Sequence, residues 1–388
     1  MTDFLYPHRI AGVRERLTEA GENNPTIHAL IVSDLENCRY LSGFTGSNAL
    51  IILSEGEAVF FTDGRYALQV AGEVTGFETL IMPQGTDLAK AAAAEIRQRT
   101  HLQSIGFEEA HLSVKGFDAL RAALDGEKDE SSVVARDGSP VALIGKSGYV
   151  ESVRAVKDAD EIARIRVAVG LADQCFNHIR AIARPGLTER DLAWQMEVFL
   201  RTNGASHLAF DSIVGSGANS ALIHGRPSDR VIGASGEPEF LLLDFGAQVN
   251  GYCSDITRTV VISGEPTPRH RAQYDAVLKA QRAAIAAIKP GAIGKDIHAV
   301  AKASLAADGF GEDAFPHGTG HQVGRVVHDG RALGLIDEVA MRPGMVVTVE
   351  PGAYIENFGG VRIEDIVLVT NAGCEILTGS PKELITLP

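Results

Sequence analysis

The chain of 388 residues is long enough for two domains, and its 45% hydrophobic and 22% charged residues are typical of a globular protein. Its formal net charge of −14 argues against nucleic acid or an anionic membrane surface as the main partner. No apolar run suggests a spanning helix or a secretory signal, and the four cysteines are widely spaced, so we expect a cytoplasmic protein with reduced cysteines.

The first part of the chain alternates between short apolar runs and amphipathic stretches. The apolar runs predict strands over residues 27–32, 49–53, 58–61, 80–82 and 104–107. Apolar residues at helical spacing predict helices over residues 9–20, 62–74, 88–97 and 113–124. Strands that alternate with helices are typical of an α/β domain. A stretch with glycine and serine, residues 137–148, is predicted to link this domain to the rest of the chain.

An internal repeat organises the remainder. A long amphipathic helix is predicted over residues 158–183, and it stops before Pro185-Gly186. The next helix is predicted to begin at Thr188, whose hydroxyl can form a capping box with Asp191. The Pro-Gly pair and the pattern after it recur from Pro290-Gly291, at a constant offset of 105 residues. We therefore expect two similar halves about a pseudo-twofold axis, with a site between them.

Each half contains a pair of apolar strands that carries two acidic residues. The pairs span residues 241–262 and 345–369, and the acidic residues are Asp244, Asp255, Glu350 and Glu364. A carboxylate in a buried strand is unfavourable unless it is paired or binds a metal. Two carboxylates on adjacent strands also repel each other. We therefore expect cations to lie between these strands.

A glycine-rich segment before the second strand pair contains His317, His321 and His328. Because its glycines would break a helix, we expect a loop whose backbone approaches a site closely. One imidazole with four carboxylates suits two divalent ions, since two dications balance four negative charges. The oxygen-rich set favours Mn²⁺, with Co²⁺ or Zn²⁺ as alternatives. A water shared by two such ions loses a proton near neutral pH, so hydrolysis of an amide or ester is expected.

These residues resemble the pita-bread metallopeptidases, and within them the proline-specific branch of Xaa-Pro aminopeptidases and prolidases. The motifs that carry the resemblance are Asp244 with Asp255, His317-Gly-Thr-Gly-His321 with His328, Thr348-Val-Glu350-Pro-Gly, and Gly360-Val-Arg-Ile-Glu364-Asp. Residues 44–48 and 62–66 resemble the creatinase-type N-terminal domain. The resemblance implies an α/β (α+β) fold. Its parts would be a creatinase-like N-terminal α/β domain, residues 1–146, and a C-terminal pita-bread domain of two pseudo-symmetric halves, residues 147–388.

The resemblance also implies the metal ligands. Asp244 would bind one ion, and His321 with Glu350 would bind the other. Asp255 and Glu364 would bridge both ions. Glu350 is in addition expected to take part in catalysis.

Five further residues are implied to contact the substrate. His224 matches a family histidine that contacts the scissile carbonyl and stabilises the oxyanion. His328 matches a second substrate-contacting histidine, and His317 one that lines the pocket past the scissile bond. Arg362 and Tyr354 occupy positions where the family has groups that contact or support the substrate. From the residues alone, His224 could also be a surface-loop histidine and Tyr354 a core residue.

The resemblance implies hydrolysis of X-Pro peptide bonds, with a proline-containing peptide as partner and a homodimer as the assembly. Our first expectation is an aminopeptidase that removes the first residue from peptides with proline second. The alternatives are an X-Pro dipeptidase, an X-Pro carboxypeptidase and a non-catalytic binding module. A creatinase lacks the metal ligands present here, and the long N-terminal domain disfavours a methionine aminopeptidase. His207 and Arg226 lie near the site in sequence without an assigned role.

Overall fold

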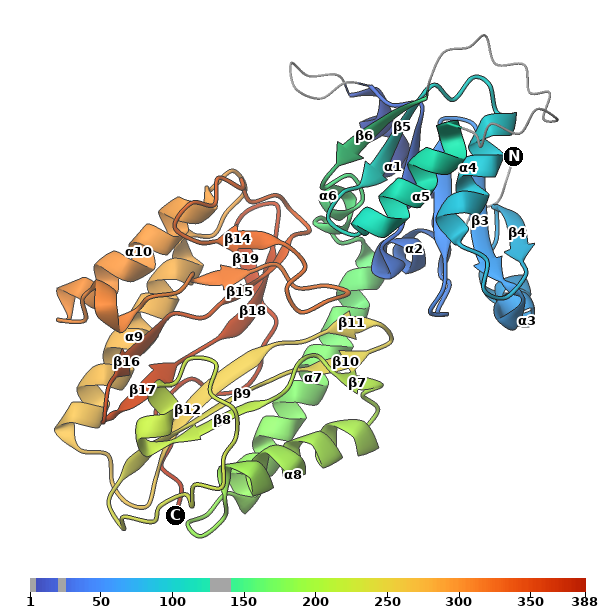
Figure 1. Cartoon of the computed structure of the whole chain (residues 1–388). Coiled ribbons are helices and arrows are strands. Elements are labelled where there is room, and N and C mark those ends of the chain that lie inside the picture. Colours follow the sequence, from blue (N-terminus) through green and yellow to red (C-terminus); the bar gives the residue numbers. More distant parts are fainter. Residues whose placement is uncertain (1–4, 20–25, 126–140) are drawn as a thin grey trace. The chain divides into compact units, whose positions relative to one another are not determined.

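The computed structural model describes residues 5–19, 26–125 and 141–388, and it divides into two compact units, Met1–Arg154 and Ala155–Pro388 (Figure 1). The prediction of a linker over residues 137–148 is wrong for the part that the structure describes. In that part, β6 (Ala142–Lys146) is a strand of the first unit. Residues 137–140 lie outside the described residues. The short helix α6 (Glu151–Arg154) also belongs to the first unit, so the division falls after residue 154 instead of 146.

The first unit is built on a six-stranded sheet. In sheet order its strands are β4 (Glu78–Met82), β3 (Ala58–Asp63), β2 (Leu50–Ser54), β1 (Ala29–Val32), β5 (Ser104–Glu108) and β6. Its other helices are α1 (Pro7–Thr18), α2 (Leu35–Ser42), α3 (Ala67–Glu73), α4 (Leu88–Gln98) and α5 (Val114–Asp125). The expected strands and helices are present with their ends shifted by a few residues; residue 20 lies outside the described residues.

Alternate residues of the central strand β1 pack on opposite faces of this sheet. Leu30 and Val32 pack with side chains of α1 and α2, whereas Ala29 and Ile31 pack with side chains of α4. Because both faces are covered, the strand is a continuous apolar run. The helix α2 was not predicted from the sequence. It is capped by Asp34, whose carboxylate accepts a hydrogen bond from the backbone of Glu36 at 3.0 Å.

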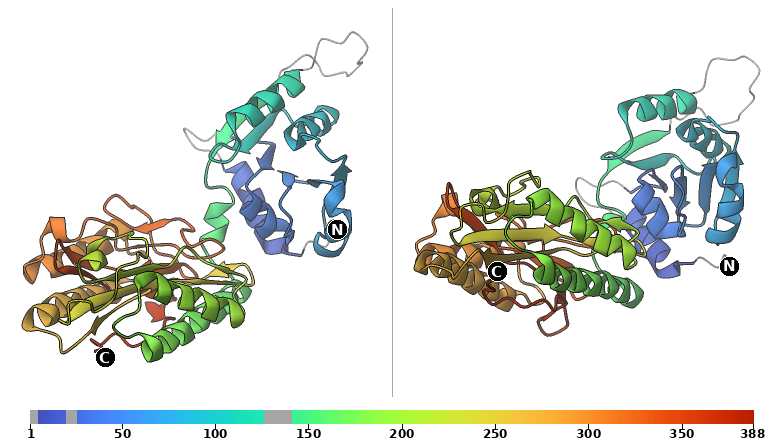
Figure 2. Two further views of the ribbon diagram at one scale, coloured as in Figure 1. Left: turned by 60° about the horizontal axis from the view of Figure 1, so that its bottom comes forward. Right: turned by 90° about the horizontal axis from the view of Figure 1, so that it is seen from below.

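The second unit contains two similar helix pairs (Figures 1 and 2). The first pair is α7 (Ala159–Ile182) with α8 (Glu189–Thr202), and the second is α9 (Pro268–Ala287) with α10 (Gly294–Ala307). The helices α8 and α10 begin and end at the same offset of 105 residues, which confirms the repeat. The capping box of Thr188 and Asp191 is also present. In the described part of the chain, no helix is long and apolar enough to cross a membrane.

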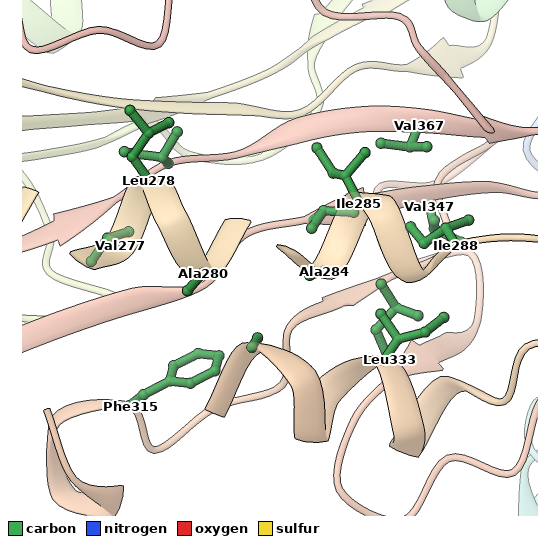
Figure 3. Close-up of a cluster of buried hydrophobic side chains, with 14 of the residues drawn as sticks. Val277, Leu278, Ala280, Ala284, Ile285, Ile288, Phe315, Leu333, Val347 and Val367 are labelled. Carbon is green, nitrogen blue, oxygen red and sulfur yellow. The ribbon is translucent and has the colours of Figure 1, made fainter. Parts of the chain in front are cut away.

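Each helix pair packs against its own strands. The pair α7 and α8 covers β8 (Ile213–Ser216), β9 (Glu239–Phe245) and β12 (Ile256–Ile262). The pair α9 and α10 covers β15 (Val346–Val349) and β18 (Asp365–Val369), beside which lies β19 (Cys374–Ile376). Figure 3 shows side chains of α9 directed toward Val347 and Val367 of these strands. The two cores therefore repeat the same architecture.

The two expected strand pairs are each interrupted in the middle. Beyond β9 and β12 the chain continues as β10 (Ala247–Val249) and β11 (Tyr252–Cys253), and beyond β15 and β18 as β16 (Gly352–Ile355) and β17 (Gly359–Arg362). Asp244 lies within β9, as expected. Asp255, Glu350 and Glu364 lie in the interruptions, so their expected place within strands is wrong. The remaining strands are β7 (His207–Leu208), β13 (Gly320–His321) and β14 (Arg331–Leu333).

Close backbone packing accounts for one of these interruptions. A Cβ atom at Gly246, between β9 and β10, would lie 2.0 Å from the carbonyl oxygen of Ser254. Only glycine allows the two chain segments to approach so closely at the point where they leave one sheet for another. The adjacent Asp255 lies between β11 and β12, and it is buried.

Candidate metal centre

The five expected ligands line a single cavity of about 320 Å³ in the second unit. They come from both halves and are Asp244, Asp255, His321, Glu350 and Glu364. His224, His317 and His328 line the same cavity. Eight of the ten residues predicted for the site are thus brought together. The other two, Arg362 and Tyr354, lie behind the cavity wall and contact residues that line it.

The glycine-rich loop approaches β15 as closely as its composition suggested. A Cβ atom at Gly320 would lie 2.0 Å from the carbonyl oxygen of Thr348. The hydroxyl of Thr348 accepts a hydrogen bond from the backbone of His321 at 3.0 Å and donates one to Oε1 of Glu350 at 3.1 Å. One threonine therefore positions two of the expected ligands relative to each other.

The imidazole of His321 faces the carboxylates with Nε2. This atom lies 3.5 Å from Oδ2 of Asp255 and 3.4 Å from Oε1 of Glu350. Its other nitrogen, Nδ1, donates to the carbonyl oxygen of Gln322 at 3.1 Å, which leaves the lone pair on Nε2. Ligand atoms of Asp255, His321 and Glu364 all lie within 4.8 Å of one another. A divalent cation fits among ligands at this separation.

Two carboxylate oxygens are buried without a hydrogen-bond partner among the described residues, Oδ1 of Asp244 and Oε1 of Glu364. Burial, followed by the charge of Asp244, raises the pKa of Asp255 well above its ordinary value. Burial and the charge of Asp255 do the same to the pKa of Glu364, and burial raises the pKa of Glu350. Buried carboxylates that repel one another are unfavourable unless cations compensate them. The set therefore fits divalent metal ions.

A chain of hydrogen bonds runs behind the cavity from Asp244 to His317. Arg362 donates through Nη2 to Asp244 and through Nη1 to the hydroxyl of Tyr354 at 2.8 Å. That hydroxyl lies 2.8 Å from Nε2 of His317, whose Nδ1 lies 2.8 Å from the carbonyl oxygen of Gly318. Burial, and then the charge of Arg362, lower the pKa of His317 to about 3. His317 is therefore a neutral imidazole that donates from Nδ1 and accepts at Nε2.

His224 and His328 complete the polar lining. The ring of His328 packs edge-on against that of His321, with 4.1 Å between the centroids. Burial, and then the neighbouring ring of His321, lower the pKa of His328. His224 is exposed at the mouth of the cavity. His207, which had no assigned role, is exposed in β7 and is not among the lining residues described.

The apolar part of the lining was not predicted. It consists of Phe210, Ile213 and Val327. Ile213 of β8 lies directly opposite Asp244 of β9 in the antiparallel register. Ile213 and Asp244 are neighbours because their strands pair, although about thirty residues of chain separate them. No local pattern in the sequence reveals this pairing.

The chain matches two families. Residues 163–371 match metallopeptidase family M24, and residues 9–156 match the creatinase/prolidase N-terminal domain. An uncharacterized peptidase of Bacillus subtilis is 38% identical over 361 residues, which cover 93% of this chain and 96% of the relative.

Two solved structures resemble the whole chain. The Xaa-Pro dipeptidase from Bacillus anthracis has a TM-score of 0.88 and 36% identity, and covers 98% of this chain and 99% of its own. The X-Pro aminopeptidase from Thermotoga maritima has a TM-score of 0.80 and 34% identity. The match covers 93% of this chain and 98% of the chain of that structure. This protein therefore belongs to metallopeptidase family M24 and carries the creatinase/prolidase N-terminal domain.

Proposed function

We propose that this enzyme hydrolyses the peptide bond that precedes proline. The observation that carries the proposal is the cluster of four carboxylates and one histidine around one cavity, with two buried oxygens that lack a partner in the described part of the protein. The two similar solved structures, both of enzymes named for X-Pro bonds, support the choice of substrate.

The five clustered residues would hold about two divalent cations, with Mn²⁺ as the first choice for ligands that are mostly oxygen. Asp244 would bind one ion, and His321 with Glu350 would bind the other. Asp255 and Glu364 would bind both ions. When bound, such ions lower the pKa of water and polarise a carbonyl oxygen. Their positive charge would also offset the repulsion among the carboxylates.

The remaining residues of the cavity would bind and orient the peptide. His224 lies at the mouth, where its imidazole can donate a hydrogen bond to the oxyanion that develops on the scissile carbonyl. Phe210, Ile213 and Val327 offer an apolar wall for the pyrrolidine ring. The nitrogen of an X-Pro bond carries no hydrogen, so recognition depends on such a shaped wall more than on backbone pairing.

A dipeptide is the substrate that the comparisons favour. The sequence favoured an aminopeptidase that acts on longer peptides, but the dipeptidase from Bacillus anthracis is the more similar of the two structures. We therefore place Xaa-Pro dipeptides first and longer X-Pro peptides second.

The test compares Ala-Pro, Ala-Pro-Ala and Ala-Ala as substrates of the full chain reconstituted with Mn²⁺. Release of free proline from Ala-Pro, with Ala-Pro-Ala cleaved at least about tenfold more slowly, supports the dipeptidase. Equal or faster cleavage of Ala-Pro-Ala would replace it with the aminopeptidase. Cleavage of Ala-Ala alone would overturn the proposal for X-Pro bonds.

A further inference from the structure

Thr257 lies at a contact between the two halves of the second unit. It is fully buried in β12, and the antiparallel register sets it directly opposite Asp244 of β9, so the two side chains share one face of the sheet. Its carbonyl oxygen accepts a hydrogen bond from the backbone of Glu364 at 3.1 Å, and Glu364 belongs to the other half. Thr257 is therefore next to one expected ligand from each half.

Two charged partners fix the direction of the Thr257 hydroxyl. Its Oγ1 lies 2.7 Å from Oε2 of Glu364 and 3.1 Å from Nε of Arg362. A guanidinium can only donate hydrogen bonds, and an ionised carboxylate can only accept them. The hydroxyl therefore accepts from Arg362 and donates to Glu364. Both bonds involve a charged group, which makes them stronger than bonds between neutral groups.

The hydroxyl completes a chain of hydrogen bonds between two carboxylates of the cavity. Arg362 also donates to Oδ2 of Asp244, so the chain runs from Glu364 through Thr257 and Arg362 to Asp244. The second oxygen of each carboxylate, Oε1 of Glu364 and Oδ1 of Asp244, is buried without a partner among the described residues. Oε2 of Glu364 also keeps a lone pair, because a carboxylate oxygen has two. The chain thus restrains both carboxylates and leaves lone pairs available for cations.

We infer that Thr257 is a positioning residue of the metal centre, whose hydroxyl holds Glu364 in the orientation that binds the ions. This inference rests on the proposed metal-dependent function. Thr348 makes a similar contact with Glu350 inside the second half, whereas Thr257 makes its contact between the halves. Replacing a residue that orients a metal ligand typically weakens metal binding by about 10–100-fold.

The experiment measures the dissociation constant of Mn²⁺ by equilibrium dialysis of the chelator-treated full chain. Valine has nearly the shape of threonine without its hydroxyl, whereas serine keeps the hydroxyl without the methyl group. Thr257→Val should therefore raise the dissociation constant by about 10–100-fold, and Thr257→Ser should stay within about threefold of wild type. If packing of the methyl group were the only role of Thr257, the order of the two variants would be reversed.

A second pair of variants applies the same comparison to a smaller side chain. Thr257→Ala and Thr257→Ser differ only by the hydroxyl, so Thr257→Ala should bind Mn²⁺ about 10–100-fold more weakly than Thr257→Ser. This pair decides the question if Thr257→Val does not fold. Urea denaturation of each chelator-treated variant shows whether it is folded before the dialysis.

Thr259→Val is the matched control. Thr259 is buried two residues further along β12, and its hydroxyl donates to the carbonyl oxygen of Arg362 at 3.0 Å and accepts from the backbone nitrogen of Arg362 at 3.1 Å. Because both bonds go to the backbone and not to a carboxylate, this variant should lose stability in urea and keep its affinity for Mn²⁺.

Three results would overturn the inference while the metal centre stands. They are wild-type affinity in Thr257→Val, equal affinities in Thr257→Ala and Thr257→Ser, and a loss in Thr259→Val as large as that in Thr257→Val. A wild type that binds no Mn²⁺ would overturn the proposed metal centre and this inference with it.

Discussion

Lys157 and Asp329 form an ion pair that is almost completely shielded from solvent. Nζ of Lys157 lies 3.4 Å from Oδ2 of Asp329, and the two side chains are 0% and 3% exposed. Asp329 directly follows His328, and its backbone donates to the carbonyl oxygen of Gln322 at 2.8 Å. Gly324 makes room for the pair, because a Cβ atom there would lie 2.1 Å from Oδ2 of Asp329. The pair thus holds the loop that carries a histidine of the cavity.

Replacing one partner of this pair should destabilise the second unit. Lys157→Met leaves a buried carboxylate without its ammonium, and the free energy of unfolding should fall by about 3–5 kcal/mol. Urea denaturation followed by the fluorescence of Trp194, the single tryptophan of the chain, measures this change. The double variant Lys157→Met with Asp329→Asn removes both charges and should recover part of the loss. A single variant within about 0.5 kcal/mol of wild type would show that the pair does not stabilise the fold.

Asp255→Asn should affect stability and metal binding in opposite directions. Burial and the charge of Asp244 raise the pKa of Asp255, so in chelator-treated protein its ionised form destabilises the fold at pH 7. This loss of stability is complete above the raised pKa of the folded state and disappears as the pH falls from that pKa to the pKa of the unfolded state. Asparagine removes the charge, and the chelator-treated variant should be more stable than wild type in urea.

The same variant should lose the stabilisation that Mn²⁺ gives to wild type, together with metal-dependent hydrolysis. Glu364→Ala should also abolish that hydrolysis. A Thr62→Val variant, changed in the first unit, serves as a control for the metal effect. An Asp255→Asn protein that Mn²⁺ stabilises as much as wild type would contradict the assignment of Asp255 as a ligand.

His317 should make the chelator-treated protein sensitive to acid. Its pKa is about 3 in the folded state, against about 6.5 for an unperturbed histidine, so folding favours the neutral ring. The stability that depends on the neutral ring is fully present above pH 6.5 and is lost as the pH falls from 6.5 toward 3.

Removing the titrating ring should weaken this dependence. Between pH 7 and 5, the unfolding free energy of His317→Asn should fall less steeply than that of wild type. The two slopes should differ by up to about 1 kcal/mol per pH unit. Urea denaturation at several pH values provides the comparison. Equal slopes for the two proteins would mean that His317 does not titrate with a lowered pKa.

His224→Ala should lower kcat by about 10²–10³-fold if the imidazole donates to the developing oxyanion. Metal content should stay unchanged, because His224 lines the cavity without belonging to the expected ligands. Steady-state kinetics on an Xaa-Pro dipeptide, with elemental analysis of the same sample, separates the two effects. An unchanged kcat would remove His224 from the mechanism.

The sequence predicted which side chains converge on the cavity but not their local structure. The spacing of carboxylates and glycines in two matching frames predicted which side chains converge, because the repeat of 105 residues brings equivalent strands together. It also suggested that all four carboxylates lie in strands, whereas Asp255, Glu350 and Glu364 lie where strands pass from one sheet to another. These interruptions depend on close contacts between separate segments of the chain, such as that of Gly246 with Ser254, and a local sequence pattern does not show such contacts.

Tertiary packing also explains the elements that the sequence did not predict. Residues 142–146 fall within the stretch with glycine and serine that was predicted to be a linker, yet they form β6 beside β5, which is their parallel partner. The helix α2 depends on a cap at Asp34 and on the left-handed Gly43, with a φ of +83°, within a segment of weak helical pattern. Trp194 of α8 and His224 likewise line one pocket, although they belong to two segments that only the fold brings together.

The central claim is that residues from both halves of the second unit bind metal ions in one cavity. Equilibrium dialysis of the purified full chain against Mn²⁺, followed by elemental analysis, measures the number of ions bound per chain. The account predicts about two, since four carboxylates and one imidazole compensate two dications. A protein that binds no Mn²⁺, Co²⁺ or Zn²⁺ at this cavity would contradict it.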